Sequence, residues 1–170
     1  VNYGKLPPAV PIRFSVDDPD GVALEMVNDY QSARNTPTTT DKAVLDITGD
    51  IEIRADLKLN EWISTDSDTG GHTIISKWEP SGNQRSYAFS LNDKGEPAFW
   101  WSADGSALQV ATATAAVPFG AGRGALRVLF DVNNGASGHD VKFWTSDDGV
   151  AWTQLGLTVT TAGVTSIRDG

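Results

Sequence analysis

Residues 50–60 read DIEIRADLKLN, and this stretch decides the fold class. Apolar and charged side chains alternate in it without a break from Ile51 to Leu59. Successive side chains of a strand point to opposite faces of a sheet, so the pattern predicts a strand with one buried and one solvated face. A helix would scatter the same charges around its axis. We therefore expect an antiparallel sheet that packs one face against a core.

The rest of the chain consists largely of short apolar runs separated by Gly, Asn and Asp turns. Between the runs 85–91 and 96–102 stands Asn92–Gly95, reading NDKG, which is typical of a β-hairpin. No ten-residue segment combines helical periodicity with capping residues. The sequence predicts an all-β antiparallel sandwich, a jelly roll with no substantial helix. We expect residues 1–27 to form a Pro-rich arm with the first strands, and residues 28–170 to form the sandwich.

Composition excludes several function classes. The 170 residues contain no Cys, so disulfides and thiolate metal sites are ruled out. A net charge of −9 without any basic run disfavours nucleic acid as a partner. No apolar run approaches the ~20 residues of a membrane helix, so we expect no membrane insertion.

Several segments carry a resemblance when they are read in order: AVLDITGD at 43–50, then IEIRADLKL, IISKW, RSYAFSL, DKGEPAFWWSADG, LRVLFDV and VKFWTSDDGVAWTQLG. Over residues 40–160 this order resembles the concanavalin A-like lectin/glucanase superfamily. The nearest likeness is to laminin G-like jelly-roll domains of actinobacterial tailed-phage virion proteins. The family fold adds one or two strands after the position of Val159, which this chain either lacks or supplies from residues 1–27.

Catalysis is not expected. Glucanases of that superfamily carry Glu-x-Asp-x-x-Glu on one strand, and none of the five Glu residues here stands in that arrangement. His72 and His139 are expected in Gly-flanked loops, and neither neighbours a nucleophile motif.

Asp66 and Asp68 have the spacing of an oxygen-rich calcium loop. Lys77 stands where an EF-hand would have its Glu, so this is no EF-hand. The alternative is a plain solvated loop. Calcium is the one cofactor to consider, because the resemblance implies a calcium at a loop rim.

The aromatic residues are the better candidates for ligand recognition. If the strands on either side of Asn92–Gly95 pair, Trp100 shares one face with small residues, among them Ser90. Such a Trp either receives a packing partner or serves as a stacking surface for a sugar ring. Trp62, in the loop that leads to the two acids, is the second candidate.

Residues 145–152 read TSDDGVAW and fit the Asp-box pattern Ser/Thr-x-Asp-x-Gly-x-x-Trp. The pattern assigns the turn-closing carboxylate to Asp147, a positive φ to Gly149 and a packing role under the hairpin to Trp152. Its expected role is structural. One copy argues against a propeller, whose blades would repeat it.

The resemblance implies a non-enzymatic virion protein, either a head decoration or a minor tail protein, at the particle surface. Its partners would be other capsid or tail subunits and host-surface carbohydrate. One alternative is a carbohydrate-binding module of a secreted bacterial glycan-active enzyme. A second is a purely structural decoration that clamps coat subunits.

Overall fold

The computed structural model describes residues 43–59, 62–63 and 72–169, which belong to one compact unit. The arm and first strands predicted for residues 1–27 lie outside the described residues. So do Asp66 and Asp68, the two acids of the predicted calcium loop.

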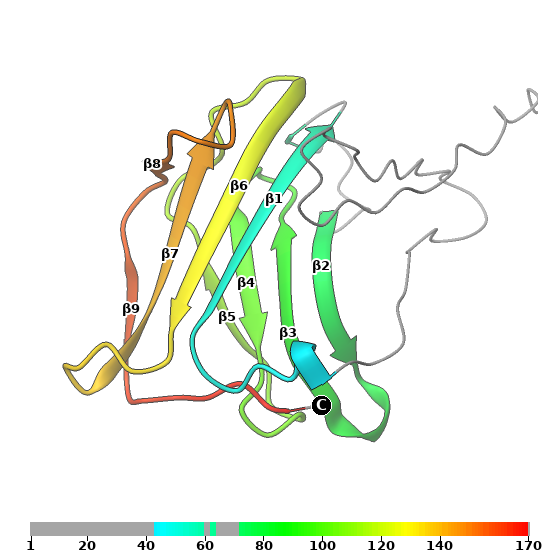
Figure 1. Ribbon diagram of the computed structural model, residues 1–170, viewed down its shortest axis with the longest axis vertical. Coiled ribbons are helices and arrows are strands. Elements are labelled where there is room, and N and C mark those ends of the chain that lie inside the picture. The colour runs from blue at the N-terminus through cyan, green and yellow to red at the C-terminus, as the bar shows by residue number, and fades with distance from the viewer. Residues whose placement is uncertain (1–42, 60–61, 64–71, 170) are drawn as a thin grey trace, which may run out of the picture. The chain divides into compact units, whose positions relative to one another are not determined.

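The described residues form two antiparallel sheets that face each other (Figure 1). The first sheet has the order β1-β6-β7-β8, and β9 also pairs with β7. The second has the order β2-β3-β4-β5. The strands are β1 (Ile51–Leu59), β2 (His72–Glu79), β3 (Gln84–Leu91), β4 (Pro97–Trp101), β5 (Gln109–Thr112), β6 (Gly122–Asp131), β7 (Gly138–Ser146), β8 (Thr153–Gln154) and β9 (Val159–Ala162). The predicted antiparallel sandwich is confirmed.

Helical structure in this part of the chain is limited to two short 3-10 turns, Ala43–Leu45 and Ser81–Asn83. Within the described residues no helix is long and apolar enough to cross a bilayer.

Strand β1 has the predicted division into two faces. Ile51 is buried, and exposed residues alternate with partly buried ones along the rest of the strand. Its register pairs Ile53 with Val128 of β6, so apolar side chains of both strands face the core together. On the other face, Arg123 of β6 pairs with Asp56 of β1 in a bidentate ion pair. The alternation in the sequence therefore determines both the buried face of β1 and its pairing register with β6.

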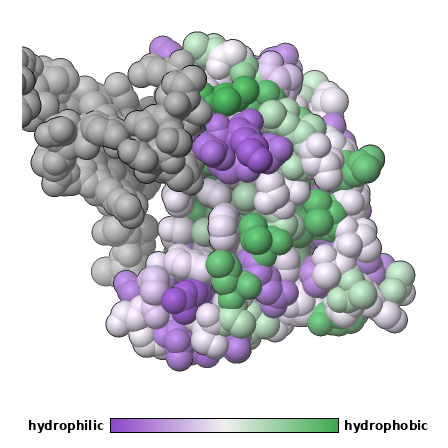
Figure 2. Space-filling view, turned by 180° about the vertical axis from the view of Figure 1, so that it is seen from behind, coloured by the Kyte–Doolittle hydropathy of each residue, from purple (hydrophilic) through white to green (hydrophobic). Residues whose placement is uncertain are grey.

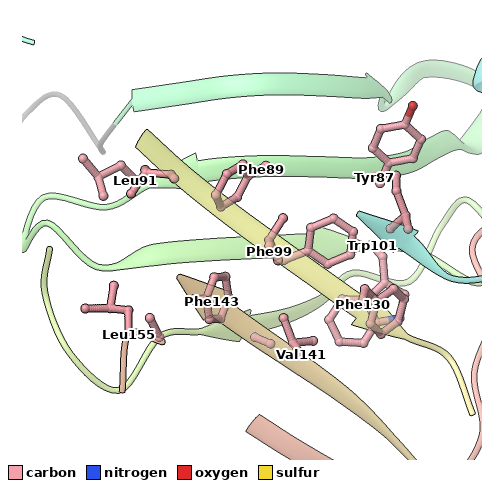
Figure 3. Packing of buried hydrophobic residues seen from close by; sticks show 14 of the residues in the cluster. Tyr87, Phe89, Leu91, Phe99, Trp101, Phe130, Val141, Phe143 and Leu155 are labelled. Atoms are coloured by element: carbon pink, nitrogen blue, oxygen red, sulfur yellow. The ribbon is translucent and has the colours of Figure 1, made fainter. Parts of the chain in front are cut away.

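The core lies between the two sheets and is mostly aromatic at its centre (Figure 3). Phe99 of β4 contacts Phe130 of β6 with ring centroids 5.2 Å apart, and Trp101 lies 4.6 Å from the same ring. Phe143 of β7 is 0% exposed. Burying each such side chain stabilises the fold by about 1.5–3 kcal/mol. These contacts join the sheets and hold their outer faces in place.

His139 is not in a loop, and that expectation was wrong. It lies in β7, is 4% exposed, and places Nδ1 2.7 Å from the carbonyl oxygen of Gly163. Its ring meets Trp101 and Phe130 edge-on at 5.4 and 5.9 Å. His72 is the first residue of β2. The flanking Gly residues suggested loops, but β2 begins at His72 itself and β7 begins one residue before His139.

Residues 164–169, the C-terminal strap, join the two sheets at one end of the sandwich. The Ile167 amide donates to Thr48 O, just before β1, at 3.0 Å. The Arg168 amide donates to Ser102 O, just after β4, at 2.7 Å, and Ser86 Oγ donates to Arg168 O at 2.7 Å. The Ile167 side chain is 2% exposed. The strap therefore closes this end of the core with both backbone hydrogen bonds and an apolar side chain.

Candidate functional site

Trp100 lies in β4 on the outer face of the four-stranded sheet. Its neighbours Phe99 and Trp101 point into the core and are 0% and 2% exposed, so strand alternation turns Trp100 outward. Across the sheet it pairs with Ala88 of β3 and Val110 of β5. The predicted separation of this hairpin into an aromatic face and a small-residue face that carries Trp100 is confirmed.

The indole of Trp100 leans over β3. Its Nε1 donates a hydrogen bond to Ser90 Oγ at 2.8 Å, and that hydroxyl lies 3.5 Å from the carbonyl oxygen of Ala98. Because Ala88 and Ser90 are small, one face of the ring can rest against the sheet while the side chain stays partly exposed. The structure thus brings the predicted residues Trp100 and Ser90 together. The polar tip of the indole is satisfied, and an apolar ring surface remains for contact.

Exposed apolar side chains also occur in and next to the other strands of this sheet. Val110 is 47% exposed and Leu108, two residues earlier, is 52% exposed. Ile75 of β2 is 44% exposed. Figure 2, the view from behind, shows hydrophobic residues gathered in the middle of that side of the molecule. Exposed apolar groups that cluster in this way are typical of interaction sites. We call Ser90, Trp100, Leu108 and Val110 the Trp100 face.

Trp62 is a correction to the sequence-based expectation. It is 1% exposed, donates from Nε1 to Gly122 O at 3.1 Å, and packs its ring at 4.7 Å against Phe119. A buried indole with both its ring and its N–H engaged offers no face to a ligand. The loop position suggested exposure, but contacts with residues far along the chain, Phe119 and Gly122, bury the side chain.

The metal prediction stays untested, because Asp66 and Asp68 lie outside the described residues. Among the residues that are described, no three His, Asp or Glu side chains come together as a metal-binding group.

Two further Trp residues, Trp144 and Trp152, belong to the outer face of the other sheet; the sequence pattern assigned a packing role to Trp152 and none to Trp144. The Arg127 guanidinium lies 4.4 Å from the ring centroid of Trp144, and that of Arg54 lies 6.0 Å from Trp152. Glu52 accepts from both arginines, at 2.7 and 2.6 Å, and the Arg127 hydrogen bond is the largest cause of its lowered pKa. Trp144 therefore carries a guanidinium on its ring, whereas Trp100 faces small and apolar neighbours.

Two turns of the same design follow β4 and β7. Residues 99–107 read FWWSADGSA and residues 143–151 read FWTSDDGVA, so Phe, Trp, Ser, Asp, Gly and Ala recur at one spacing. In each turn the Ser hydroxyl donates to the Asp two residues later and accepts from the Gly amide. Oδ1 of that Asp also accepts two further backbone N–H groups. The Gly adopts a positive φ in both copies, +83° and +73°. A comparison of the sequence with itself would have found this repeat.

The carboxylate that closes the second turn is Asp148, not Asp147 as the Asp-box pattern suggested. The amides of Val150 and Ala151 donate to Asp148 at 2.8 Å and lower its pKa. In the first turn, the amides of Ala107 and Ser106 lower the pKa of Asp104 to about 2. The expected positive φ of Gly149 is confirmed, and the hydrogen bonds to Asp148 and Ser146 close the turn.

Comparisons with known proteins give no family. No family model matches the chain, and neither a curated protein nor a solved structure matches it. The likeness to laminin G-like domains therefore rests on the segments quoted above and remains an expectation.

Proposed function

We propose that this sandwich is a non-enzymatic binding module that recognises carbohydrate through the Trp100 face. The observation that carries the proposal is the indole of Trp100, bonded at its tip to Ser90 and bordered by exposed Val110. A sugar ring has C–H groups on its faces and hydroxyls on its rim. It can stack on such an indole while its hydroxyls reach neighbouring polar groups.

The face is rigid before any ligand arrives. Trp100 sits between two buried aromatic neighbours on a central strand of its sheet, and its Nε1 hydrogen bond restricts the side chain further. A preorganised side chain loses little conformational entropy on binding, so more of the contact free energy appears as affinity. This supports a recognition role that needs no conformational change.

For the biological setting we propose the surface of a tailed-phage virion, as a head decoration or minor tail protein that displays the module to host-surface glycans. This part rests on the resemblance of residues 40–160. A carbohydrate-binding module of a secreted bacterial enzyme would use Trp100 in the same way. A coat-clamping decoration would instead cover the Trp100 face with a neighbouring virion protein.

The test compares Trp100→Ala with wild type on a glycan array and in pull-downs with purified bacterial cell walls. Trp144→Ala is the matched control, because it removes an indole from the other outer face. We expect Trp100→Ala to weaken binding at least tenfold, about 1.4 kcal/mol, and Trp144→Ala to leave it within twofold. Absence of any glycan signal for wild type, or equal loss in both variants, would refute the proposal.

The setting needs a separate measurement. Antibodies against the domain should decorate intact phage particles in electron micrographs, and mass spectrometry should find the chain in purified virions. Recovery of the chain next to a hydrolase domain in a secreted bacterial protein would favour the alternative setting while leaving the role of Trp100 unchanged.

A further inference from the structure

A pocket lies at the end of the sandwich where the turn after β7 meets Pro118 and Phe119. Pro118, Phe119 and Ala151 form its apolar part. Its polar part includes Thr145, Asp147 and Asp148. Phe119 is partly exposed and its ring is supported from behind by the buried ring of Trp62 at 4.7 Å. The pocket therefore presents an aromatic surface beside hydrogen-bonding groups, and it is separate from the Trp100 face.

Thr145 provides the first sign that the pocket takes a ligand. The residue is only 6% exposed and lines the pocket. No hydrogen bond to its hydroxyl occurs among the described residues. The hydroxyl is accessible from the pocket, because it is not one of the fully buried polar atoms that lack a partner, and it can still donate and accept a hydrogen bond. A ligand atom in the pocket would satisfy it.

Asp147 provides the second sign, and the repeated turn supplies the comparison. The first copy has Ala103 where the second has Asp147, yet both turns form the same hydrogen bonds. The turn itself therefore does not require a carboxylate at this position. Asp147 is exposed, lines the pocket, and makes no hydrogen bond or ion pair within the described part of the chain.

The charge of the pocket selects the chemistry of its ligand. Two of the residues that line it are carboxylates and none is Lys or Arg. A cation is attracted both by a carboxylate and by the face of an aromatic ring. The hydroxyl of Thr145 and the apolar surface of Phe119 and Pro118 fit a body with hydroxyl groups and C–H faces.

We propose that this pocket binds the protonated amine of an amino sugar, with the amine on Asp147, a sugar hydroxyl on Thr145 and the ring against Phe119. The site gives the molecule a second point of glycan recognition, at the end of the sandwich. It stands independently of the Trp100 face, since none of its residues belongs to that face.

The test is a titration of the isotopically labelled chain with glucosamine, followed by NMR, with N-acetylglucosamine and glucose as comparison ligands. Glucosamine should shift the resonances of Thr145, Asp147 and Phe119. The two uncharged sugars should bind at least roughly tenfold more weakly, because they lack the charge-assisted hydrogen bond to Asp147. Added salt should weaken glucosamine binding.

Asp147→Ala is the decisive variant, because the first turn already folds with Ala at this position. It should reduce glucosamine affinity at least tenfold without changing the melting temperature. Trp100→Ala should leave the glucosamine-induced shifts of Thr145, Asp147 and Phe119 unchanged, which separates this site from the proposed glycan face. Equal binding of glucosamine and N-acetylglucosamine, unchanged affinity in Asp147→Ala, or no shifts at any sugar concentration would overturn the proposal.

Discussion

Ile167 in the C-terminal strap allows a quantitative test of how the sandwich is closed. Its side chain is 2% exposed and belongs to the hydrophobic core. Ile167→Ala removes three buried carbon atoms, about 2.4 kcal/mol at about 0.8 kcal/mol for each. Incomplete collapse of the cavity adds to this, so we expect a total loss of about 3–4 kcal/mol in the free energy of unfolding. The melting temperature should fall by roughly 10–15 °C.

Urea unfolding followed by tryptophan fluorescence measures this loss, and the slope against urea should stay constant if only stability changes. Val164→Ala is the matched control, since Val164 lies in the same strap but is 58% exposed. It should change the free energy of unfolding by less than about 0.5 kcal/mol. The reasoning fails if the two variants unfold at the same urea concentration, because the strap would then not contribute to the core.

Two further predictions concern the repeated turns. Hydrogen bonds within the turns lower the pKa of Asp104 to about 2 and also lower the pKa of Asp148 from its ordinary value of 3.8. Each carboxylate therefore stabilises the fold above pH 3.8, and this stabilisation is lost as the pH falls through the lowered pKa, which for Asp104 is about 2. Asp104→Asn should therefore be less stable than wild type at pH 7 and lose less stability between pH 4 and 2, as urea midpoints at each pH will show; parallel pH profiles would contradict it. Gly149→Ala should cost about 1–2 kcal/mol, because the position has a positive φ but open space. Gly105→Ala should cost clearly more, since its Cβ would lie 1.8 Å from Asn83 O; equal melting temperatures of the two variants would exclude this.

Strands and tight turns could be predicted from the sequence, because each depends on residues that are close together in the chain. The period-two alternation of 51–59 specified a strand and its buried face, because a one-residue slip would expose every apolar side chain. The turn at Asn92–Gly95 specified the hairpin that places Trp100 outward beside Ser90. These two features sufficed to predict the fold class and one candidate face.

Long-range packing was beyond the same reasoning. Trp62 is buried because Phe119, far along the chain, meets its ring, and no local pattern reports that contact. Strand β5 covers only Gln109–Thr112. Beyond it, the amides of Ala113 and Val117 donate to the carbonyls of Pro97 and Gly95. The sequence did not single out Thr145, because its place in a pocket depends on how the end of β7 lies relative to Pro118 and Phe119.

The two repeated turns, after β4 and after β7, are suitable positions for a pair of spectroscopic labels. Strands β4 and β7 end at opposite ends of the sandwich, so the two turns mark its length (Figure 1). Ser106 and Val150 occupy equivalent positions in them, both are exposed, and each donates its backbone amide to the Asp of its turn, which a cysteine would also do. Because the chain has no Cys, a cysteine at each position would attach one pair of fluorophores or spin labels without competition. A distance measured between them would report directly on any stretching or opening of the domain when it meets a surface.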